Sequence, residues 1–164
     1  MTHDRMAIAG GLTLAEAESV VASTSEGWTF RAHRKIYYPY FWFHLRYTTR
    51  TLLGNSSVRL SCLVDTRTGL TSTTDPFELE RVDVNAGAVL GSRLAEDDAL
   101  RIAHRYGAHA VLHKRKALVV PDVTVLERGL VHKPFWIVDG RKRRQSSFRV
   151  LVDGVTGAFH VLRH

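Results

Sequence analysis

The sequence predicts an α+β protein in which two tandem units each combine one helix with an antiparallel sheet of three to four strands. Three observations carry this prediction. A capping box opens an apolar helical stripe near the N-terminus, aromatic and β-branched residues dominate the segments that follow, and one short pattern occurs twice. The length of 164 residues suits one ordinary domain, or two very small ones that share a core.

The chain opens with residues 1–11, which we expect to form a flexible arm before the first helix. Thr13-Leu14-Ala15-Glu16 has the pattern of a capping box, in which the hydroxyl and the carboxylate each accept a backbone N–H. Ala17 and Val21 follow at helical spacing, so the sequence predicts a helix over residues 13–24.

Strand-forming residues follow this helix. Residues 29–50 are rich in aromatics and threonine, which favours a long strand. Residues 54–57, Gly-Asn-Ser-Ser, predict a turn, and residues 58–64 predict a second strand. Asp65-Thr66-Arg67-Thr68-Gly69 then suits a hairpin turn, with residues 70–74 as the returning strand.

The second half repeats this order after a connector, residues 75–91, in which residues 77–84 are expected to form a strand. A helix begins near Leu94, with acidic residues in its first turn, although Gly107 argues against its continuity. The strands expected after it are residues 123–138, 147–152 and 158–162.

An internal repeat links the two halves. Residues 60–69 and 148–157 share the pattern apolar-x-apolar-Leu-Val-Asp-x-x-Thr-Gly, and Pro39 and Pro134 precede it in equivalent aromatic segments. We therefore expect a first helix-plus-sheet repeat over residues 12–74 and a second over residues 92–164, sharing one core.

This order, which ends in strand, Val-Asp-x-x-Thr-Gly and strand, resembles the PepSY domain and the broader cystatin-like class, in two tandem copies. The resemblance implies that a helix packs across an antiparallel sheet in each copy. PepSY domains are mostly extracytoplasmic and are thought to bind or inhibit proteases. This chain lacks an evident export signal, so the resemblance carries over the fold and not that role.

The segment from Ile36 to Tyr47 contains seven of the fifteen aromatic residues. Its two faces are both apolar, so we expect one to be covered by a helix and the other by the second repeat or a partner. We therefore predict a non-enzymatic binding or structural module that engages a protein or peptide through an aromatic sheet face or a strand edge. A sheet edge would also allow a homo-oligomer. The candidate partner-binding residues are Tyr38, Tyr40, Trp42 and Trp136.

The net charge of +7 arises entirely in the second half, because residues 1–90 carry nine basic and nine acidic side chains. Such asymmetry suggests an anionic partner, and the alternative function is a nucleic-acid-associated protein. A solvated loop explains the same charges without a ligand. The candidate anion-binding residues are Lys114, Arg115, Lys116, Arg141, Lys142, Arg143 and Arg144.

The sequence offers little catalytic or metal-binding chemistry, so we expect no cofactor and no metal site. Cys62 is the only cysteine, and its alternation with Leu60 and Val64 predicts core packing. His109 and His113 share a helical face without an acidic neighbour to complete a site. A small enzyme with a pocket lined by strand histidines is a further alternative. No segment is apolar enough to span a membrane, and we expect a cytoplasmic protein.

Overall fold

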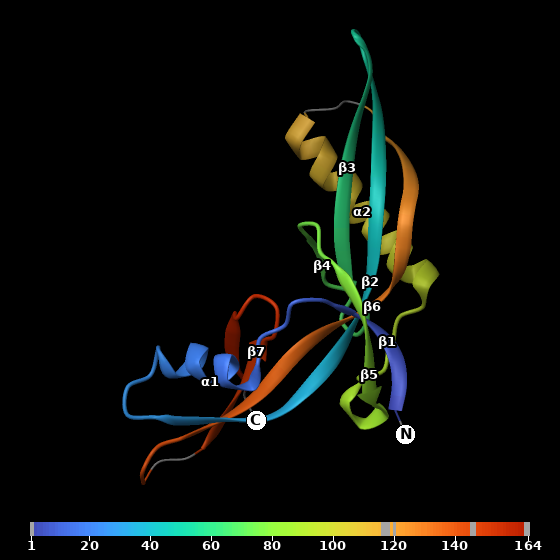
Figure 1. Cartoon of the computed structure of the whole chain (residues 1–164). Helices are drawn as coiled ribbons and strands as arrows, with labels where there is room; N and C mark the ends of the chain where they lie inside the picture. The colour runs from blue at the N-terminus through green and yellow to red at the C-terminus, as the bar shows by residue number, and fades with distance from the viewer. Residues whose placement is uncertain (1, 116–118, 120, 145–146, 163–164) are drawn as a thin grey trace. The chain divides into compact units, whose positions relative to one another are not determined.

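A computed structural model describes residues 2–115, 119, 121–144 and 147–162 (Figure 1). Within these residues the chain forms two α-helices and eight strands. The elements are β1 (Thr2–Ile8), α1 (Leu14–Ala22), β2 (Thr29–Thr51), β3 (Gly54–Asp65), β4 (Thr71–Thr73), β5 (Leu79–Asn85), a 3₁₀ turn (Ala86–Ala88), α2 (Glu96–Arg115), β6 (Asp122–Arg141), β7 (Phe148–Asp153) and β8 (Phe159–Leu162).

The described strands form one mixed sheet in the order β4-β3-β2-β6-β1-β5, and β7 pairs with β6 and with β8. The hairpins β2–β3, β3–β4, β6–β7 and β7–β8 are antiparallel, as is the pair β1–β5. Strands β1 and β6 meet in parallel register, at Ala7 and His132. The predicted α+β class with mostly antiparallel pairing is therefore confirmed.

The chain divides into two compact units. Unit 1 contains Met1–Tyr38, Phe77–Gly91 and His132–His164, and unit 2 contains Pro39–Pro76 and Ser92–Val131. The long strands β2 and β6 each pass from one unit into the other. The repeats expected over residues 12–74 and 92–164 follow sequence order, whereas each compact unit draws on both halves of the chain.

The segment expected as a flexible arm is instead largely strand β1. Its residues pair with β5 from Thr2 opposite Asn85 to Ile8 opposite Leu79, and Ala7 and Ile8 are buried. The connector therefore supplies the partner strand. The sequence concealed this pairing because both strands are rich in charged residues, which favour solvent.

Unit 1 is built on α1, which begins at the predicted capping box. The Glu16 N–H donates to the Thr13 hydroxyl at 3.3 Å, and the Glu16 carboxylate accepts the Thr13 N–H at 2.7 Å. Ala17 and Val21 are buried on this helix and pack with apolar residues of β2, β6 and β7. The buried members of this core outside the helix are Phe30, Val138, Val150 and Val152.

Unit 2 is built on α2, which packs against β2, β3 and β6 (Figure 1). Ala99, Ala103 and Val111 are its buried residues in this core. Cys62 is fully buried there, and burial raises the pKa of its thiol to about 11. This burial confirms the predicted core role of Cys62. A thiol with such a raised pKa stays protonated at neutral pH and is therefore a poor nucleophile. The strand residues of this core are Phe41, Phe43, Leu45, Tyr47, Cys62 and Val64.

The helix α2 runs unbroken through Gly107, although glycine is a poor helix former. The Tyr47 side chain is buried against the helix at this point, and its hydroxyl donates to the His104 carbonyl at 3.3 Å. A Cβ atom at position 107 would overlap the Tyr47 ring, with the ring carbon Cζ only 2.6 Å away. The glycine is therefore required by tertiary packing and not by helix geometry.

The two Asp-x-x-Thr-Gly turns are equivalent in their hydrogen bonds. The Asp65 Oδ1 atom accepts the N–H groups of Arg67 and Thr68 at 2.7 and 3.1 Å. The Asp153 Oδ1 atom accepts the equivalent pair of N–H groups at 2.9 and 3.2 Å. The glycines that close the turns have φ angles of 75° and 76°, a region that glycine adopts without strain.

Each turn also anchors the entry of a helix that belongs to the other half of the sequence. In unit 2 the Leu94 N–H donates to the Thr66 carbonyl at 2.8 Å, two residues before α2. In unit 1 the Leu12 N–H donates to the Gly154 carbonyl, two residues before α1. Each compact unit therefore joins the helix of one half to the hairpin of the other.

Replacing Gly107 with alanine should destabilise unit 2 by about 1–3 kcal/mol through overpacking, despite a gain of about 1 kcal/mol in helix propensity. Chemical denaturation measures the change. The Gly129→Ala variant is the control, because nothing lies within 4 Å of a Cβ atom at that glycine. Adding Tyr47→Phe removes the nearest clashing atom. The double variant should therefore lose less unfolding free energy than the two single variants lose together. Strict additivity would contradict this account of Gly107.

Candidate functional site

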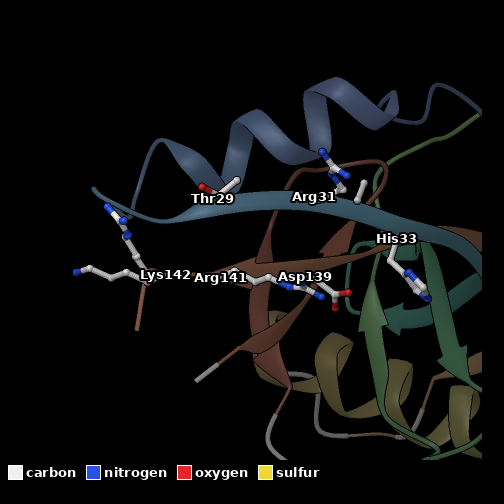
Figure 2. Close-up of a pocket in the computed structure, with 8 residues that line it drawn as sticks. Thr29, Arg31, His33, Asp139, Arg141 and Lys142 are labelled. Carbon is white, nitrogen blue, oxygen red and sulfur yellow. The ribbon is translucent and has the colours of Figure 1, made fainter. Parts of the chain in front are cut away.

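A basic groove opens in unit 1 between β2 and the end of β6, and Figure 2 shows its lining side chains. Its volume is about 560 Å³, within the range of small-molecule sites. The lining residues are Thr29, Arg31, Ala32, His33, Asp139, Arg141, Lys142 and Arg143.

The alternation of side chains along each strand determines which of them face this groove. In β2, Phe30 points into the α1 core, so Thr29, Arg31 and His33 project from the other face of the strand. In β6, Val138 is buried in the same core, and Asp139 therefore also projects away from α1. The groove thus lies on the sheet face that α1 leaves uncovered.

The electrostatic character of the groove is cationic. Its lining contains four basic side chains, from Arg31, Arg141, Lys142 and Arg143, and one carboxylate, from Asp139. The Arg149 Nε atom donates to that carboxylate at 2.9 Å, so its charge is balanced by a residue outside the lining. The four basic side chains of the lining therefore attract anions. Arginine in particular can bind a phosphate group through two parallel N–H donors.

The predicted anion-binding residues separate into two groups. Arg141, Lys142 and Arg143 line the groove of unit 1, and Arg144 is exposed in the turn that follows. Lys114 and Arg115 lie in the last turn of α2, which belongs to unit 2, and Lys116 falls outside the described residues.

Arg31, from the first half of the sequence, was missed as a groove residue. Its alternation with Phe30 and Ala32 marks it as a solvent-facing strand residue. Nothing in the sequence brings it to β6, because that requires knowing which strands are neighbours.

Two of the predicted partner-binding aromatics belong to unit 1. Tyr38 makes an edge-to-face contact with Phe135, with ring centroids 6.1 Å apart. The Trp136 indole N–H donates to the Leu12 carbonyl at 2.8 Å, and the Lys35 ammonium lies 5.5 Å from its ring. Trp136 therefore helps to fix the entry of α1, and its side chain is half-buried.

Tyr40 and Trp42 belong to unit 2 and alternate with the buried Phe41 and Phe43. They are half-buried on the sheet face away from α2, where Trp42 lies opposite Leu63 in β3. This face continues along the hairpin into polar residues, the first of which in β2 is His44.

The histidines proposed for a pocket have separate surroundings. In unit 2, His44 Nδ1 lies 2.6 Å from the Ser61 hydroxyl. In unit 1, His132 is buried and its Nδ1 atom lies 3.2 Å from the Met6 carbonyl, whereas His160 is exposed on β8. Within the described part of the chain, no group of three or more His, Cys, Asp or Glu side chains could hold a metal ion.

Burial holds the pKa of the His132 imidazole below its ordinary value, and the charge of Arg5 acts in the same direction. The hydrogen bond to Met6 opposes this shift but does not reverse it. The folded protein therefore binds a proton at His132 less readily than the unfolded chain does. Its contribution to stability is present above the unfolded pKa of about 6.5 and is lost as the pH falls through the folded value.

Unfolding measurements should accordingly show a loss of stability as the pH is lowered below about 6.5. The His132→Gln variant should lose less over the same range, since glutamine keeps a donor for Met6 and cannot be protonated. His160→Gln, at an exposed histidine, should follow the unchanged protein. Identical pH profiles for all three proteins would show that His132 is not buried in its neutral form.

Within the described residues, neither helix is both long and apolar enough to cross a membrane. Comparison with known proteins found no family model that matches the chain, and no curated protein or solved structure with significant similarity to it.

Proposed function

We propose that the chain is a non-enzymatic binding module that holds the phosphate backbone of a nucleic acid in the basic groove of unit 1. The single observation that carries this proposal is the groove itself, whose lining contains four cationic side chains and one carboxylate that is already paired with Arg149. Phosphate contacts by Arg and Lys supply most of the affinity in nucleic-acid binding without sequence preference.

The chemistry of the groove favours binding over catalysis. Its titratable residues other than Arg and Lys are His33 and the paired Asp139. The protein's thiol, Cys62, is fully buried in the core of unit 2 with a raised pKa, which makes it a poor nucleophile. Thr29 adds a hydroxyl donor, which is a common phosphate contact.

We further propose that the chain is a fused pair of cystatin-like or PepSY-like units, placed in the cytoplasm. The two equivalent Asp-x-x-Thr-Gly turns and the equivalent leucine anchors of α1 and α2 support the pairing of two related units. In this proposal each helix packs across the hairpin of the other copy, as after an exchange of helices between tandem repeats.

A second candidate function, engagement of a protein strand, is favoured by β8. This strand ends the sheet beside β7, and Phe159 and Val161 are 37% and 54% exposed on it. Such an edge can pair with a strand of a partner or of a second copy. Sedimentation should then show self-association that Val161→Lys weakens. A monomer at all concentrations would contradict the pairing of β8 with a second copy of the chain.

The groove variant Arg31→Ala/Arg141→Ala/Arg143→Ala tests the main proposal. The plot of log affinity against log salt has a negative slope. Removing three phosphate contacts should make this slope shallower by about 2 for a single-stranded oligonucleotide. Fluorescence anisotropy across a salt series measures that slope.

The matched control removes three exposed arginines outside the groove, Arg5→Ala/Arg93→Ala/Arg105→Ala, and changes the net charge equally. It should leave the slope close to that of the unchanged protein. Equal slopes for both variants would attribute any binding to net charge, and no measurable affinity at low salt would overturn the proposal.

A further inference from the structure

A second polar cavity, of about 410 Å³, lies on the β2–β3 hairpin of unit 2. The two strands of this hairpin pair without interruption from Tyr40 opposite Asp65 to Thr51 opposite Gly54. The turn therefore lies at Leu52 and Leu53, and residues 54–57, expected as a turn, belong to β3. The lining residues are Arg46, Thr48, Asn55, Ser56, Ser57 and Arg59.

Arg46 and Arg59 are direct cross-strand partners on one face of this hairpin. Among the residues that the structure describes, neither forms an ion pair. The sequence between Tyr40 and Val64 contains no acidic residue at all. Like charges directly opposite one another destabilise a sheet, so this arginine pair costs stability unless an anion lies between the two side chains.

The side chains beside the arginine pair suit an oxyanion. Thr48 and Ser57 are also cross-strand partners, two residues further along on the same face, and each carries a hydroxyl donor. Asn55 adds an amide, and no carboxylate is present in the lining. Two guanidinium groups and neighbouring hydroxyls are the donors that phosphate oxygens accept.

Arg46, though not Arg59, has a cationic counterpart in the hairpin of unit 1. Tyr40 lies opposite Asp65 and Phe135 lies opposite Asp153, so the two hairpins can be aligned on their turn aspartates. Six residues after these aromatic residues stand Arg46 in β2 and Arg141 in β6, and Arg141 lines the groove of unit 1.

We propose that Arg46 and Arg59, assisted by Thr48 and Ser57, form a second phosphate site, so that each unit carries one. The choice of a nucleic-acid phosphate as the natural occupant rests on the proposed function. The site itself rests on the arginine pair and its donors. Binding neutralises the repulsion across the hairpin, which couples the anion to the stability of unit 2.

The variant Arg46→Gln/Arg59→Gln tests this site through two opposite effects on the melting temperature. In chloride buffer it should melt higher than the unchanged protein, because the repulsion is gone. Inorganic phosphate at equal ionic strength should raise the melting temperature of the unchanged protein, and the variant should keep only the part of that rise that the groove of unit 1 supplies. The control Arg93→Gln/Arg105→Gln, with exposed arginines of the same unit, should respond to phosphate as the unchanged protein does.

The same pair of changes, made in the groove variant, separates this site from the groove of unit 1. The groove variant should keep part of its phosphate response, and the added changes should abolish that remainder and reduce the oligonucleotide salt slope by a further 1.4 or so, for two contacts. Loss of the whole response in the groove variant would overturn the second site and leave the proposed function standing. A full response in the groove variant that the added changes abolish would support the second site and overturn the groove.

Discussion

The Asp-x-x-Thr-Gly turn fixes the position of a helix as well as that of two strands. The aspartate oxygen holds two backbone N–H groups, and the glycine takes a φ angle near 75° that closes the hairpin. The carbonyl of the next residue after the aspartate is thereby left to accept the N–H of a leucine that precedes a helix. Because the same arrangement occurs at Thr66 and at Gly154, one local constraint organises both compact units.

This constraint determines which surfaces are buried and which stay open. The helix lies across one face of its unit, and the side chains of Ala17 and Ala99 are fully buried there. In unit 2 the buried face is so closely packed that Tyr47 excludes any side chain at Gly107. Polar and cationic residues collect on the opposite faces, where Arg46 and Arg141 each stand six residues after the aromatic residue that pairs with a turn aspartate. Both anion-binding proposals therefore concern the sheet faces opposite the helices.

The sequence predicts the local structure well and the long-range structure poorly. The capping box at Thr13, the two turns and the core role of Cys62 all depend on neighbouring residues, and each has the predicted place. The packing of each helix on the hairpin of the other half does not follow from the sequence pattern, because α1 and α2 have buried alanines at equivalent positions and by that measure fit either hairpin. Strand β1 was missed for lack of an apolar pattern. The sequence identifies the basic residues that begin at Arg141 as candidates for anion binding. Assigning Arg31 to the same groove requires knowing that β2 and β6 are neighbours in the sheet.

The central claim, that each helix packs on the hairpin of the other half, can be tested without any mutation by nuclear Overhauser contacts. A Cβ atom at Gly69 would lie 3.5 Å from the Ile102 δ1 carbon, and one at Gly157 would lie 3.7 Å from Val20. The account predicts contacts from the Gly69 α-protons to the Ile102 methyl group, and from the Gly157 α-protons to the Val20 methyl groups. Contacts of Gly69 with Val20 and of Gly157 with Ile102 would place each helix on its own hairpin and contradict it.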